Sequence, residues 1–217
     1  MMAQQIPAPW WDAYSNIIPH GYRSFIAAES QATEMQLFSA LVVPGILQTQ
    51  RYGEECIGTT PFRLSSEIME QLLEVRMKRQ WHTLEQSNPP KIDVVLEEPV
   101  LYRQLGGPQI LKEQLRHLLA LNKQSNITIR ILPLEAMTVL SWQMAIYTLF
   151  VNKIPHNSSI FFEDYMGAMI EDNTSAVTNY YSLLFSQLLL KALDKTSSDA
   201  LIKTAIKWLD TTVAAHD

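Results

Sequence analysis

The sequence predicts an α+β domain in which helices surround a central sheet of about five strands. Hydrophobic residues make up 47% of the 217 residues and charged residues 18%, so a sizeable core can form. Segments with helical apolar spacing are interspersed with short alternating segments, which is typical of mixed architectures. Only seven glycines are present, which argues against an all-β barrel. No linker, repeat or low-complexity segment divides the chain, so we expect one domain over 1–217.

The first half predicts short helices, one strand and one long helix. Pro19 separates the first two helices, and Met35 and Leu37 share one side of an alternating segment. Ser65 or Ser66 can cap the long helix. In order, we expect helices at 9–18 and 21–31, a strand at 33–38, a turn at 43–45, and helices through 48–57 and from 65 or 66 to about 85.

The second half predicts four strands and three helices. Ile127, Ile129 and Ile131 lie on one face of a strand, and Pro108 suits the first turn of a helix. Polar residues interrupt the apolar stretch 176–193, which predicts a buried helix rather than a membrane span. We expect strands at 91–97, 126–132, 145–151 and 158–163, and helices at 108–123, 173–194 and 197–214, the last one amphipathic.

Charge and cysteine content exclude several classes of function. Lys and Arg are outnumbered 17 to 22 by Asp and Glu, so we expect no direct nucleic-acid binding. Residues 1–10 lack the features of a signal peptide, and Cys56 stands alone, which suits a reducing cytoplasm. The five histidines show no metal-binding spacing. The sequence therefore predicts a cytoplasmic protein with no metal, cofactor or membrane contact.

The helix over 67–84 breaks its own amphipathic pattern. Arg76, Arg79 and Gln80 project from the middle of its apolar arc. A guanidinium cannot shed its charge, so each arginine needs carboxylates, carbonyls or a bound anion. The apolar arc consists of Ile68, Met69, Leu72, Leu73, Val75, Met77 and Leu84.

Two interpretations of these arginines stay open. They can form an internal ion network with acids at strand ends, the candidates being Glu97, Glu98, Glu163 and Asp164. Alternatively, together with Arg103 they can line a pocket for an acidic or hydrogen-bonding ligand.

Gln114 lies within the apolar arc of the helix over 108–123. A buried amide must find partners, so this glutamine is either a satisfied core residue or a ligand contact. A similar choice concerns Asp172, which precedes a helix containing Tyr180 and Tyr181. A magnesium-diphosphate site with an aromatic pocket is one interpretation, but helix capping explains Asp172 more simply.

Five stretches in the correct order resemble one family. VPGILQT at 43–49 followed by Arg51-Tyr52 is similar to its "vPGLLQT-x-x-Y" signature, and RMKRQ at 76–80 is similar to "RmxRQ". The other three are VLEEPVLYR at 95–103 with Gly106-Gly107, QLRHLL at 114–119, and residues 127–133. The family is the C-terminal domain of unknown function of actinobacterial-type xenobiotic-response-element (XRE) class helix-turn-helix regulators, often labelled antitoxin-like, and the resemblance covers roughly residues 9–200.

The resemblance implies a ligand-sensing or partner-binding effector module, holding a small molecule or a small protein. The ligand-site positions that match its motifs are Arg76, Arg79, Gln80, Glu98, Arg103 and Gln114. Two departures stand out. Nine residues precede Trp10, which we expect to be too few for a DNA-binding head. Pro99 follows Glu98 where the family tends to have a small helix former.

Two alternative functions stay open. One is a stand-alone cyclase, isomerase or lyase on an apolar natural product, with Glu98, His117, Glu163 and Asp164 as candidate acids or bases. The other is a homodimer built on the final helix, although such a stripe more often packs on its own domain. The stripe consists of Leu201, Ile202, Ala205, Ile206, Leu209 and Val213.

Overall fold

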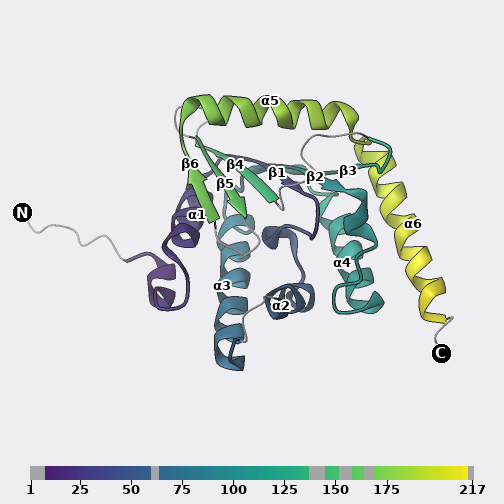
Figure 1. Cartoon of the computed structure of the whole chain (residues 1–217), viewed down its shortest axis with the longest axis horizontal. Coiled ribbons are helices and arrows are strands. Elements are labelled where there is room, and N and C mark those ends of the chain that lie inside the picture. The colour runs from purple at the N-terminus through teal and green to yellow at the C-terminus, as the bar shows by residue number, and fades with distance from the viewer. Residues whose placement is uncertain (1–7, 60–63, 137–144, 152–157, 164–168, 215–217) are drawn as a thin grey trace, which may run out of the picture.

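A mixed β-sheet forms the centre of the computed structural model, which describes residues 8–59, 64–136, 145–151, 158–163 and 169–214 (Figure 1). Within these residues the sheet has six strands in the order β3-β2-β1-β4-β5-β6. The neighbours β1, β2 and β3 run parallel, whereas β4, β5 and β6 continue the sheet antiparallel. The strands are β1 (Glu34–Ser39), β2 (Lys91–Glu97), β3 (Ile127–Leu132), β4 (Ala145–Phe150), β5 (Ser158–Glu163) and β6 (Met169–Asp172).

Helices cover both faces of this sheet. Figure 1 shows α2, α3 and α4 on one side and α5 running across the other, while α6 packs against α4 and β3. The α-helices are α1 (His20–Gln31), α2 (Gln50–Gly58), α3 (Ser66–Leu84), α4 (Pro108–Leu121), α5 (Ser175–Lys191) and α6 (Lys195–Ala214). Within the described ranges there are also three short 3-10 helices, η1 (Trp10–Tyr14), η2 (Gly45–Leu47) and η3 (Glu98–Leu101).

The pleat of the strands divides the core into two layers. Met35 and Leu37 of β1 belong to the large cluster beneath α2 and α4, whereas Phe38 belongs to a smaller cluster beneath α5. Successive side chains of a strand point to opposite faces, so these residues pack on different helices. Phe185 and Leu188 of α5 complete the smaller cluster.

The α+β class predicted by the sequence is confirmed, with differences in the elements. The described sheet has a sixth strand, β6, which is only four residues long and too short to show a period. The helix expected over 9–18 is the 3-10 helix η1. The stripe of the last helix packs on its own domain, with Ile202 and Leu209 fully buried. No helix among the described residues combines the length and apolarity needed to cross a membrane.

The expectation that 176–193 is a buried helix is wrong for one face of α5. Tyr180, Leu183 and Leu190 are 58%, 67% and 78% exposed. The inner residues pack on the sheet, but no further layer among the described residues covers the outer side. A helix covered on one side only leaves apolar residues of its other side in solvent.

Candidate functional site

The segment over 43–49, here called the signature loop, follows β1 and contains η2. It carries the VPGILQT sequence, and its η2 segment contacts both α3 and α4. Ile46 and Leu47 are buried, which anchors the loop by its apolar side chains. Its polar backbone groups therefore need partners from the neighbouring helices.

Two glutamine side chains supply those partners. Gln80 of α3 donates through Nε2 to the carbonyl oxygens of Gly45 at 2.7 Å and Gln48 at 2.9 Å. Gln114 of α4 donates to the carbonyl oxygen of Leu47 at 2.8 Å and accepts from the backbone N–H of Thr49 at 2.7 Å. Gln114 is fully buried, so these bonds satisfy its amide inside the core.

Arg76 supports the same loop through Gln48. Its Nη1 donates to Gln48 Oε1 at 2.5 Å and to the carbonyl oxygen of Gly53 at 3.2 Å. Gln48 in turn donates to the carbonyl oxygen of Val43 at 2.7 Å and to Cys56 Sγ at 3.3 Å. The arginine charge is thus spread over amide and carbonyl oxygens.

Arg79 lies behind the loop and is 3% exposed. Its Nη1 donates to the hydroxyl of Tyr22 at 2.6 Å, and its guanidinium stands over the rings of Tyr22 and Phe25. A Cβ at Gly45 would be 2.7 Å from Arg79 Nη2, so any larger residue at this position would force the guanidinium to shift.

The counter-charge of Arg79 is Glu29 of α1, with 3.0 Å between Arg79 Nε and Glu29 Oε2. Burial raises the pKa of Glu29 to about 7, although the charge of Arg79 lowers it. Sequence reasoning missed this partner. The available signal was a glutamate three and four residues after Ile26 and Phe25, on the apolar face of the helix expected over 21–31.

The structure thus brings together four of the six predicted site residues and separates the other two. Glu98 begins η3 and accepts from the backbone N–H of Leu134 at 3.0 Å. Arg103 is exposed after η3. The ligand-binding role of all six residues stays a prediction.

The two candidate acids and bases whose side chains the structure describes, Glu98 on η3 and His117 on α4, lie on different elements. Burial raises the pKa of Glu97 and lowers the pKa of His117, which lies half-buried on α4. Asp164 lies outside the described residues, as does the side chain of Glu163. Among the residues that the structure describes, no three His, Cys, Asp or Glu side chains gather in a way that could hold a metal ion.

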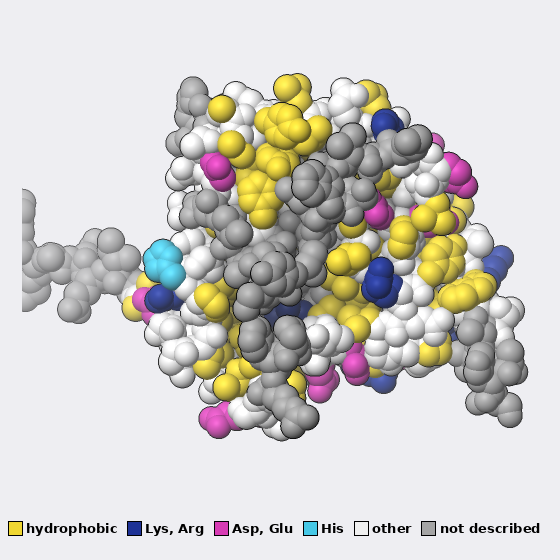
Figure 2. Space-filling view, in the orientation of Figure 1, with side chains coloured by type: hydrophobic (Ala, Val, Ile, Leu, Met, Phe, Trp, Pro, Cys, Tyr) yellow, Lys and Arg dark blue, Asp and Glu magenta, His cyan; other side chains and the backbone are white. Residues whose placement is uncertain are grey.

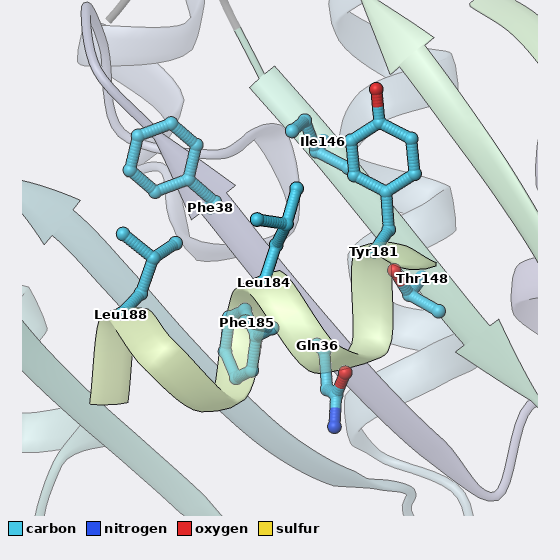
Figure 3. A pocket seen from close by; sticks show the side chains of 8 residues that line it. All are labelled: Gln36, Phe38, Ile146, Thr148, Tyr181, Leu184, Phe185 and Leu188. Atoms are coloured by element: carbon cyan, nitrogen blue, oxygen red, sulfur yellow. The ribbon is translucent and has the colours of Figure 1, made fainter. Parts of the chain in front are cut away.

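The cavities lined by described residues include three to which no residue of the signature loop contributes. Figure 3 shows the first, where Leu184 and Phe185 of α5 stand over Phe38 and Gln36 of β1. Its volume of about 10 Å³ leaves room for roughly one water molecule, so this region is core packing. A groove of about 270 Å³ lies between α2 and α3, and a hollow of about 450 Å³ lies beside the first turns of α5.

The outer face of α5 is an exposed apolar surface. Tyr180, Leu183 and Leu190 recur at helical spacing, and no charged residue occurs from Ser175 to Leu190. Figure 2 shows hydrophobic side chains gathered along the upper edge of the molecule, where Figure 1 places α5. Exposed Ser186 and Gln187 lie between Leu183 and Leu190, so this face is uncharged but not wholly apolar. Exposed apolar side chains gathered on one helix face mark interaction sites more often than single exposed residues do.

Comparison with known proteins identifies the family without assigning a function. No curated protein and no solved structure matches the chain. Residues 22–204 match the family described as a domain of unknown function, DUF5753. This match spans α1 to α6 and includes the signature loop with all of its polar partners. The chain therefore belongs to the DUF5753 family.

Proposed function

We propose that this protein is a non-catalytic, cytoplasmic effector module that binds a protein partner through the outer face of α5. The observation that carries the proposal is the uncharged apolar surface formed by Tyr180, Leu183 and Leu190. The resemblance to effector domains of XRE-class regulators supports the same class of function. In a regulator that contains such a module, binding of the partner would be the signal to which the regulator responds.

The internal contacts favour binding over catalysis. The side chains of Arg76, Gln80 and Gln114 donate hydrogen bonds to the signature loop and to residues that support it. Glu98 holds a backbone N–H, and neither Glu98 nor His117 lines any of the three cavities. A catalytic acid or base must reach the substrate. A substrate bound in one of these three cavities would not meet Glu98 or His117 in its lining.

The simplest occupant of the α5 face is a second copy of the chain. Copies with a net charge of −5 repel one another, so they associate most easily through a surface without charges. Two copies of α5 can meet around a twofold axis, with the same stripe on both sides. The helix is about 25 Å long by its 17 residues, which is a small contact, so we expect a micromolar, concentration-dependent dimer.

Sedimentation velocity over a concentration series tests this proposal. We expect the wild-type chain to dimerise and the Leu183→Ser/Leu190→Ser double variant to stay monomeric, because both side chains are already exposed and their loss leaves the core intact. Leu134→Ser is the matched control, since Leu134 is 67% exposed elsewhere on the surface. A wild-type chain that stays monomeric up to about 1 mM refutes the self-association.

A further inference from the structure

The hollow at the start of α5 is lined by aromatic side chains and one carboxylate. Its volume of about 450 Å³ lies within the range of small-ligand sites, roughly 300–1,000 Å³. Phe162 reaches it from β5 and Asp172 from β6. The remaining lining residues belong to α5 and are Ala176, Val177, Tyr180 and Tyr181.

Three aromatic rings line this hollow, and the ring of Tyr181 stands at a steep angle to each of the other two. The Phe162 and Tyr181 ring centroids are 5.0 Å apart with an interplanar angle of 64°. The Tyr180 and Tyr181 centroids are 5.2 Å apart at 89°. Rings inclined in this way form a corner rather than a flat stack. The faces of aromatic rings carry partial negative charge, which attracts cations, and groups of such rings bind quaternary ammonium ions.

A carboxylate borders the same space. Asp172 Oδ1 accepts from the backbone N–H and the hydroxyl of Thr174, both at 2.8 Å. These bonds lower the pKa of Asp172, so the group is ionised at neutral pH. Both bonds use Oδ1, and Oδ2 has no hydrogen-bond partner among the described residues. No Lys or Arg is among the described lining residues, so nothing in that lining neutralises the carboxylate.

We propose that this hollow binds an organic cation, such as an alkylated ammonium group, between the three rings and Asp172. A neutral aromatic ligand would use the rings but gain nothing from the carboxylate, which is why the combination favours a cation. The site goes beyond the docking function proposed above and does not rest on it, although Tyr180 belongs to both surfaces.

Titration calorimetry on the full chain tests the charge requirement. The probes are choline and its neutral isostere 3,3-dimethylbutan-1-ol, which has the same shape without the charge. We expect choline to bind at least about fivefold more tightly than the alcohol. Equal affinities, or no choline binding up to about 50 mM, would overturn the proposal.

Matched variants locate the binding. Asp172→Asn keeps an acceptor for Thr174 and removes the charge, so choline affinity should fall about fivefold while the alcohol is unaffected. Asp194→Asn is the control, because Asp194 makes the same type of bond to the backbone N–H of Ser197 at the start of α6. An unchanged choline affinity in Asp172→Asn contradicts the assignment.

Substitutions of Tyr180 test the aromatic wall. Tyr180→Leu should weaken choline binding about fivefold, whereas Tyr180→Phe keeps the ring and should bind like wild type. Tyr180 is exposed, so neither change disturbs the core. The Leu183→Ser/Leu190→Ser variant should still bind choline, which separates failure of this site from failure of the docking face. A wild-type choline affinity in Tyr180→Leu would contradict the proposed role of the aromatic rings.

Discussion

The buried pair of Glu29 and Arg79 makes a specific prediction about stability and pH. Burial raises the pKa of Glu29 from 4.5 to about 7 in the folded protein, even though Arg79 lies 3.0 Å away. Each unit of pKa difference corresponds to about 1.4 kcal/mol, so ionisation of Glu29 reduces the free energy of unfolding by about 3 kcal/mol. Because the folded-state pKa is the higher one, this stability is fully present below pH 4.5 and is lost as the pH rises through 7.

The Glu29→Gln variant isolates this effect because glutamine does not titrate. Urea unfolding followed by tryptophan fluorescence, at a series of pH values from about 4 to 8.5, gives the free energy of unfolding of both proteins. We expect the wild-type value minus the Glu29→Gln value to fall by about 3 kcal/mol across this range. Groups that titrate in both proteins cancel in the difference.

Arg79→Met supplies a second measurement on the same pair. The charge of Arg79 lowers the pKa of Glu29, so its removal should move the midpoint of the pH dependence above 7. A difference between wild type and Glu29→Gln that stays constant from pH 4.5 to 8 would refute the reasoning. It would mean that the arginine compensates fully for the burial of the carboxylate.

Two further predictions concern the signature loop, and both are checked by urea unfolding. Gln114→Leu leaves the buried carbonyl of Leu47 and the part-buried N–H of Thr49 without partners and should lower the free energy of unfolding by about 2–4 kcal/mol. Gln109→Leu, on the exposed side of α4, should be nearly neutral. Equal costs would show that the Gln114 amide does not hold the loop. Gly45→Ala places a Cβ against Arg79, whose buried partners hold it in position, and should lower the free energy of unfolding by about 1–3 kcal/mol. The control is Gly58→Ala, where the new Cβ meets no atom within 4 Å and the free energy of unfolding should be unchanged or slightly raised. A neutral Gly45→Ala would mean that the guanidinium can move aside.

The spacing of apolar residues along each helix predicted which polar side chains of α3 and α4 point into the core, but it did not predict which groups they contact there. Helical spacing predicted that Arg79 and Gln114 face the core, and both are buried. The carboxylate that meets Arg79 could not be predicted, because it comes from α1 and depends on how α1 packs on α3. The acids proposed at strand ends were chosen from the sheet alone, which is why Glu29 was missed.

Arg103 and α5 show two other limits of sequence reasoning. A motif match grouped Arg103 with Arg76 and Arg79. After β2, however, the chain enters the 3-10 helix η3, with Pro99 in its first turn, and Arg103 is exposed. For α5, composition predicted burial, because an apolar sequence alone does not tell how many layers will cover a helix. The exposed stripe at Leu183 and Leu190 became visible only once the layers were known.

The position of β1 in the sheet has a consequence for the order of folding. Residues 34–39 pair in parallel with residues 91–96 and antiparallel with residues 145–150. The strands β1, β2 and β3 and the helices α2, α3 and α4 precede β4 in the sequence and leave the ribosome before it, whereas α6, which packs on β3, follows β4. Until then one edge of β1 keeps its backbone donors and acceptors open, and such an edge recruits strands from other chains. Premature termination between β3 and β4 would therefore produce an aggregation-prone fragment rather than a smaller working domain.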